Sequence, residues 1–103
     1  MTEPHNWVII KTPDCYKVLG GWSGGYLDGD LWQLNSGIKS VTEDADYYYF
    51  EGWSSSIYKC RKLNWRVTMA MSGTLGKLIE AGAELMDENT DWMELFEDTI
   101  AEN

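Results

Sequence analysis

Short runs of β-branched and aromatic residues dominate the chain as far as residue 71. The run WVIIK at 7–11 is apolar almost throughout, whereas WRVTMAM at 65–71 alternates apolar and polar positions. Both patterns are typical of strands, and the alternating one indicates a strand with one buried face. The strongest strand signal is YYYFEGW at 47–53, because aromatic side chains favour strands. The predicted strand segments are 7–11, 15–19, 30–34, 38–41, 47–53, 57–62 and 65–71.

The spacing of apolar residues changes in the C-terminal third of the chain. Between residues 74 and 86 they recur at intervals of three and four, which predicts a helix with one buried face. Ser72 or Thr74 can cap the start of this helix. The same spacing predicts a second helix over residues 91–101, and Thr90 is its expected N-cap.

Strands followed by helices are the pattern of an α+β domain. We predict one antiparallel sheet of about five to six strands within residues 7–71, with both helices packed on one face of it. No linker or low-complexity run divides the 103 residues, so a single domain over residues 1–103 is expected.

The net charge of the chain limits the kinds of partner that we expect for this domain. The chain has 17 acidic and 8 basic residues, which give a net charge of −9. This balance disfavours direct contact with nucleic acid or an anionic membrane, and it favours a basic protein partner. There is no apolar run of about 18 residues and no pattern of a signal peptide, so a cytoplasmic location is expected.

The residues that commonly carry catalysis are few. Cys15, Cys60 and the single histidine, His5, lack the spacing of a zinc site, and both cysteines are expected to be free thiols. A glycosidase needs two carboxyl groups across a cleft, and a chain of this length offers little room for one. We therefore expect a protein that is not an enzyme and that holds no metal or cofactor.

A glycine-rich stretch, GGWSGGYLDGDLWQLNSG at 20–37, is a candidate ligand loop. Its glycines follow neither a phosphate-binding order nor a calcium-loop order, so we interpret it as bend, hairpin and turn. The aromatic residues around it can still stack on a sugar or a nucleobase. The residues of this alternative ligand site are Trp22, Tyr26, Trp32, Trp53, Arg61 and Arg66.

Acidic residues concentrate near the C-terminus. Residues 87–102 contain seven carboxylates and no lysine or arginine. A solvated helix face is one interpretation, and a surface that occupies a basic groove built for phosphates is the other. The candidate contact residues are Asp91, Glu94, Glu97 and Asp98, followed by Glu43, Asp44 and Asp46.

The stretch YKVLGGWSGGYLDGDLWQLNSGI, in a small, acidic and tryptophan-rich chain, resembles small accessory proteins of tailed bacteriophages and prophages. The resemblance covers about residues 7–60 and lies in overall texture. It implies a stoichiometric inhibitor of the anti-CRISPR or anti-restriction kind, acting in the host cytoplasm.

We therefore predict a non-enzymatic inhibitor whose partner is a basic host protein or nucleoprotein complex that handles nucleic acid or defends the cell. A protein that binds a nucleotide or a sugar, and a virion assembly component, are the alternatives.

Overall fold

The computed structural model describes residues 1–22 and 31–101, with side chains as far as residue 96. Strands come first and most of the helical structure follows, so the α+β class is confirmed. The elements are β1 (Asn6–Lys11), β2 (Tyr16–Trp22), β3 (Leu31–Leu34), β4 (Ile38–Glu43), β5 (Tyr47–Gly52), β6 (Ile57–Arg61), the 3-10 turn η1 (Lys62–Asn64), α1 (Met69–Glu80), β7 (Glu84–Leu85) and α2 (Trp92–Ala101).

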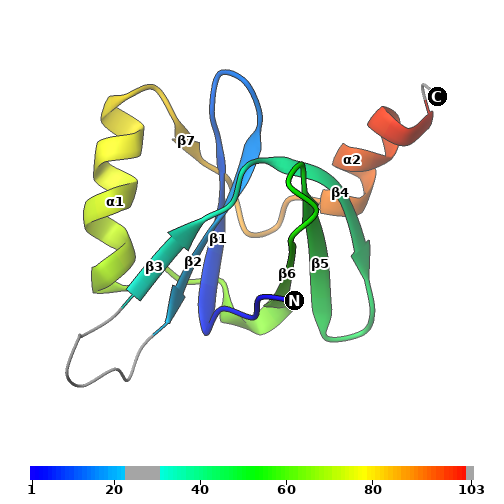
Figure 1. Cartoon of the computed structure of the whole chain (residues 1–103), viewed down its shortest axis with the longest axis horizontal. Coiled ribbons are helices and arrows are strands. Elements are labelled where there is room, and N and C mark those ends of the chain that lie inside the picture. Colours follow the sequence, from blue (N-terminus) through cyan, green and yellow to red (C-terminus); the bar gives the residue numbers. More distant parts are fainter. Residues whose placement is uncertain (23–30, 102–103) are drawn as a thin grey trace.

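The strands form two sheets rather than the single sheet that was predicted. One has the order β3-β2-β1-β7 and the other the order β4-β5-β6, and neighbouring strands are antiparallel in both (Figure 1). The chain passes from the first sheet to the second at Asn35, whose backbone N–H donates to Val18 O and whose Oδ1 accepts from Val18 N. Gly37 follows with φ +135°, a conformation that favours glycine.

Strand β1 is buried on both faces, which explains its uninterrupted apolar run. Val8 and Ile10 pack beneath α1, in a cluster with Met71. Trp7 and Ile9 point the other way, into a larger cluster between the two sheets. That larger cluster is rich in aromatic residues and consists of Trp7, Ile9, Val18, Ile38, Val41, Phe50, Tyr58, Cys60, Trp92 and Phe96.

The predicted strand at 65–71 is wrong, because α1 begins at Met69. Met69 is 88% exposed and Met71 is fully buried. Two residues that are two positions apart share a face in a strand but lie on nearly opposite sides of a helix, so the apparent alternation indicated the wrong element. The helix packs through Met71 and Leu75, at the spacing of one helical turn.

The first predicted helix, at 74–86, is therefore displaced. Helix α1 ends at Glu80, Gly82 has φ +107°, and Glu84–Leu85 forms the short strand β7 against β1. The positive φ at Gly82 is unfavourable for other residues and stops the helix before the apolar pattern ends.

The second predicted helix is confirmed by α2, although its cap is one residue later than expected. The backbone N–H of Glu94 donates to Asp91 Oδ1 at 3.1 Å, which makes Asp91 the N-cap in place of Thr90. The helices do not share one face of one sheet. Helix α1 contacts β2, β3 and β7, whereas α2 contacts β4 of the second sheet (Figure 1).

Most of the glycine-rich stretch, residues 23–30, lies outside the described residues, and so does the turn expected at Asp28. Strand β2 runs through Gly20 and Gly21 before it. At Gly21 the chain passes close to α1, since a Cβ there would lie 2.6 Å from Met71 Sδ. This close approach is a packing reason for glycine at that position.

Candidate functional site

The two groups of candidate acidic residues, one at α2 and one in the β4–β5 hairpin, lie far apart in the structure. Leu95 and Phe96 of α2 line the same hollow as Ile38, so α2 lies at the first residue of β4. Glu43 is the last residue of that strand. Five residue steps of about 3.3 Å separate the two ends of β4 by roughly 17 Å. The carboxylates of the β4–β5 hairpin therefore do not extend the acidic surface of α2.

The hairpin carboxylates hold the hairpin itself. Asp44 Oδ1 accepts hydrogen bonds from the backbone N–H groups of Asp46 and Tyr47, and its Oδ2 accepts one from the Tyr49 hydroxyl at 2.6 Å. The Tyr49 hydrogen bond and the two backbone ones lower the pKa of Asp44, and Asp44 raises the pKa of Tyr49 to about 12. Glu43 forms an ion pair with Lys62 at 2.5 Å, and this hydrogen bond raises the pKa of Lys62.

Four exposed carboxylates precede and open α2, and we call them the acidic segment: Asp87, Glu88, Asp91 and Glu94. Within residues 1–22 and 31–96 the one ion pair joins Lys62 to Glu43, so no lysine or arginine there neutralises the acidic segment. Asp91 caps the helix and Asp87 accepts from the backbone of Asn89. The side chains of Glu97 and Asp98 lie outside the described ones.

An apolar groove adjoins the acidic segment, and we call it the α2 groove. It has a volume of about 210 Å³ and lies between α2 and the ends of the strands, lined by Cys15, Tyr16, Ile38, Trp53, Leu95 and Phe96, with Asp14 and Lys39 at its polar positions. A second hollow of about 310 Å³ is lined by Thr90, Asp91, Glu94 and Leu95. Leu95 belongs to both hollows, so the groove is continuous with the part of the acidic segment that Asp91 and Glu94 form.

The tryptophans of the alternative ligand site do not form a platform. Trp22 pairs with Leu31 and Trp32 pairs with Gly21, a register that puts the two indoles on opposite faces of their sheet. Trp53 follows β5 in the other sheet and is 62% exposed, with Lys39 Nζ 6.0 Å from its ring centroid. Tyr26 lies outside the described residues.

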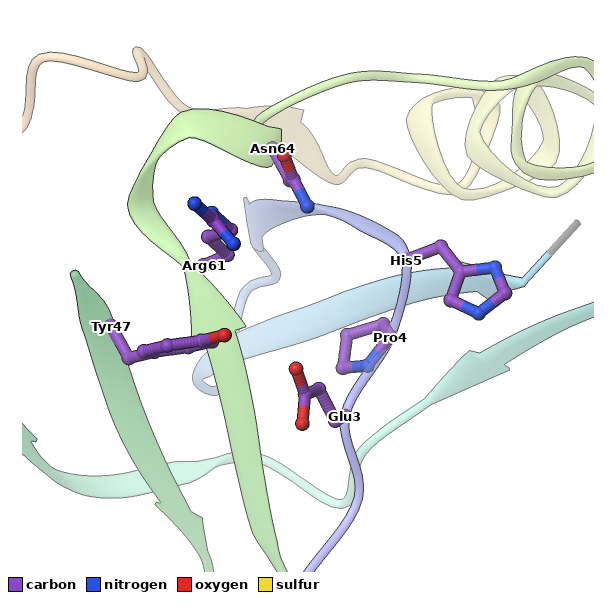
Figure 2. A pocket seen from close by; sticks show the side chains of 6 residues that line it. All are labelled: Glu3, Pro4, His5, Tyr47, Arg61 and Asn64. Carbon is purple, nitrogen blue, oxygen red and sulfur yellow. The ribbon is translucent and has the colours of Figure 1, made fainter.

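The two arginines of that alternative also separate. Arg61 borders a polar cleft of about 530 Å³ at the far end of the β4-β5-β6 sheet. Figure 2 shows its lining, which consists of Glu3, Pro4, His5, Tyr47, Arg61 and Asn64. Arg66 is exposed and does not line this cleft.

Sequence reasoning missed Glu3, Tyr47 and Asn64 as partners of Arg61. One signal was available, because Tyr47 starts one predicted strand and Arg61 is the last residue but one of the next, predicted at 57–62. A hairpin of these strands makes them neighbours, and the structure pairs Tyr47 with Arg61 directly.

The described residues contain no group of three histidine, cysteine or carboxylate side chains placed to hold a metal ion. Cys60 is buried, and burial raises the pKa of its thiol well above the ordinary value, which favours the unreactive protonated form. None of the helices in the described part of the chain is long and apolar enough to cross a membrane.

Comparisons with known proteins give no relative: no family model matches the chain, and neither a curated protein nor a solved structure is significantly similar to it.

Proposed function

We propose that this protein is a non-enzymatic inhibitor that binds a basic surface of a bacterial host complex which handles nucleic acid or defends the cell. The observation that carries the proposal is the continuity of the unneutralised acidic segment with the α2 groove and its exposed Trp53. The resemblance of residues 7–60 to accessory proteins of tailed phages is the reason for choosing a bacterial host.

The two parts of this surface have different tasks in such a complex. Trp53 and the groove offer apolar area that becomes dry on binding, and tryptophan is among the residues that most often dominate binding energy. Carboxylates at the rim attract a basic partner and speed its association, and they disfavour acidic partners. A groove that binds phosphates also accepts ordered carboxylates, because both release its counterions.

Affinity capture tests the proposal. The full chain is immobilised, exposed to bacterial lysate at low salt, and eluted with rising salt before the captured proteins are identified. We expect a nucleic-acid-binding protein that elutes as salt screens the contact, and that free nucleic acid displaces.

Charge reversal locates the contact on the chain. The double variant E88K/E94K is expected to reduce capture about tenfold or more, because it turns attraction into repulsion. The double variant E80K/E84K is the matched control, since it makes the same change in charge at two exposed carboxylates at the end of α1 and in β7, on the other sheet. Circular dichroism verifies that all variants stay folded.

Three outcomes contradict the proposal. The first is equal loss of capture with E80K/E84K and with E88K/E94K. The second is capture that neither variant changes. The third is a captured partner that nucleic acid does not displace.

A further inference from the structure

The polar cleft lies where the N-terminal segment crosses from one sheet to the other. Thr2 pairs with β6, because its N–H donates to Ile57 O at 2.8 Å and its carbonyl accepts from Lys59 N at 2.7 Å. Three residues later the N–H of His5 donates to Gly21 O in β2 at 2.9 Å. The segment that forms one wall of the cleft is thus tied to both sheets.

The carbonyl of Glu3, inside this wall, is also held. Trp22 Nε1 donates to Glu3 O at 3.0 Å, and the ring of Pro4 lies against Gly20, where a Cβ would be only 2.9 Å away. Trp22 therefore fixes the backbone of Glu3 in the wall of the cleft. The wall is preorganised, so a ligand would not have to order it on binding.

The opposite wall is fixed through its backbone. Trp7 Nε1 donates to Arg61 O at 2.6 Å, and Asn6 Nδ2 donates to Asn64 O at 3.5 Å. Both interactions use carbonyl groups, so they leave the guanidinium of Arg61 and the amide of Asn64 available to the cleft. Figure 2 shows Tyr47 reaching from β5 across β6, with Arg61 next to it, Asn64 beyond Arg61, and Glu3 on the facing wall.

One basic and one acidic side chain, Arg61 and Glu3, line the cleft, so the excess of negative charge of the chain does not extend into it. Within the described part of the molecule, Arg61 forms no ion pair and its guanidinium has no hydrogen-bond partner. Lys59 Nζ lies 4.4 Å from the centroid of the Tyr47 ring, on the same sheet face as Arg61, but outside the lining of the cleft. Lys62, in contrast, is paired with Glu43.

We propose that this cleft binds a mononucleotide, with AMP as its best representative. The Arg61 guanidinium binds the phosphate, for which its planar donors are suited. Tyr47 offers a ring surface to the base, the Asn64 amide matches the donor and acceptor of an adenine edge, and the Glu3 carboxylate accepts from ribose hydroxyls.

Size and charge separate a mononucleotide from other anions. A volume of about 530 Å³ is in the range of small-molecule sites, and inorganic phosphate would leave most of it unused. A polynucleotide would be repelled by the net charge of −9 outside the cleft. This proposal is independent of the acidic segment, which lies at the other end of the β4-β5-β6 sheet.

The test is to titrate the full chain separately with AMP, adenosine and inorganic phosphate, and to measure binding by NMR and by calorimetry. We expect saturable binding of AMP, weaker binding of adenosine, and weaker binding still of phosphate. Resonances of Tyr47, Arg61 and Asn64 should shift with AMP.

Two variants separate the contributions. Arg61→Gln is expected to weaken AMP binding about tenfold or more and to remove the difference between AMP and adenosine. Tyr47→Leu is expected to weaken AMP and adenosine alike, roughly fivefold or more. Arg66→Gln is the matched control, an exposed arginine outside the cleft, and should leave AMP affinity within about twofold.

The proposal is overturned if AMP does not saturate at millimolar concentration, or if phosphate binds as tightly as AMP, which would indicate an anion site only. Equal losses with Arg61→Gln and Arg66→Gln would also overturn it, because they would indicate unspecific attraction. E88K/E94K should leave AMP binding unchanged, so this proposal and the proposed inhibitor function fail or succeed separately.

Discussion

At one end of the β4-β5-β6 sheet, Trp53 and Leu95 border an apolar groove beside unneutralised carboxylates. At the other end, Tyr47 and Arg61 border a polar cleft. Between them the core is one continuous aromatic cluster, in which Trp92 stacks on Trp65 at 5.9 Å. The two ends thus pack on the same core but differ in charge: carboxylates without a basic partner border the groove, whereas Arg61 and Glu3 line the cleft together.

The number of charged residues near each end does not by itself decide which charge that end presents to a partner. The hairpin has carboxylates too, but Asp44 holds the turn and Glu43 neutralises Lys62. Arg61, at the same end, lines the cleft with Glu3 and forms no ion pair in the described part of the chain. The charge that each end presents therefore depends on which of its side chains have no partner within the fold.

The largest expected effect tests whether the two ends depend on one core. Trp92→Ala removes a fully buried ring that contacts Phe50 and Trp65, so it should lower the free energy of unfolding by about 3–5 kcal/mol. Denaturant unfolding followed by circular dichroism measures this. Trp53→Ala, at an exposed position, should change stability by less than about 0.5 kcal/mol but weaken partner binding.

If Trp92→Ala melts α2 and leaves the Tyr47 cleft folded, as amide exchange would show, the two ends are independent units and the shared-core interpretation is wrong.

A smaller effect sharpens the contrast between these ends and the α1 side of β1. Gly21→Ala would bring a Cβ within 2.6 Å of Met71 Sδ and should cost about 1–3 kcal/mol in thermal or denaturant unfolding. Gly73→Ala, on an open position of α1, should instead stabilise the protein by about 0.5–1 kcal/mol. A stabilising G21A would contradict the close packing of α1 on β2.

The smallest effect concerns the charges that the hairpin uses for itself. Asp44→Asn removes the main cause of the raised pKa of Tyr49, so that pKa should fall from about 12 toward 10.0. Ultraviolet titration of the phenolate measures it, with Tyr49→Phe to identify the transition. Asp46→Asn is the matched control and should leave the transition near 12 if Asp44 is the cause.

The direction of the pH dependence follows from these shifts. In the folded protein the pKa of Asp44 lies below 3.8. Its contribution to the free energy of unfolding is therefore present above pH 3.8 and is lost as the pH falls through the folded pKa. Because the folded pKa of Tyr49 is about 12, its contribution is complete below 10.0 and is lost as pH rises through 12. D44N should weaken both dependences.

Local pattern was sufficient for much of the secondary structure. The strands at 7–11, 38–41 and 47–53 and the second helix were predicted close to their observed bounds, because each has a pattern that only one element satisfies. Residues 65–71 were wrong because the alternation of four apolar residues also fits a chain that enters a helix at Met69. Only the burial of Met71 beneath β2 decides between them.

The candidate sites were less accessible to prediction. The acidic character of the C-terminal segment was visible in the sequence, but its continuity with Trp53 was not, since some forty residues separate Trp53 from Leu95. The cleft depends on Glu3 and Arg61 lying on facing walls, although an even longer stretch of sequence separates them. No short stretch of sequence indicates that Trp53 lies near Leu95 or that Glu3 lies near Arg61.

The α+β class, most strands, the second helix and the excess of negative charge could all be predicted from the amino-acid sequence, because they depend on neighbouring residues and on composition. The tertiary structure decided that there are two sheets, that α1 and α2 pack on different ones, and which charges stay unpaired. The physical reason is that pairing between distant segments depends on burial and geometry in the folded chain, which no short window of sequence contains.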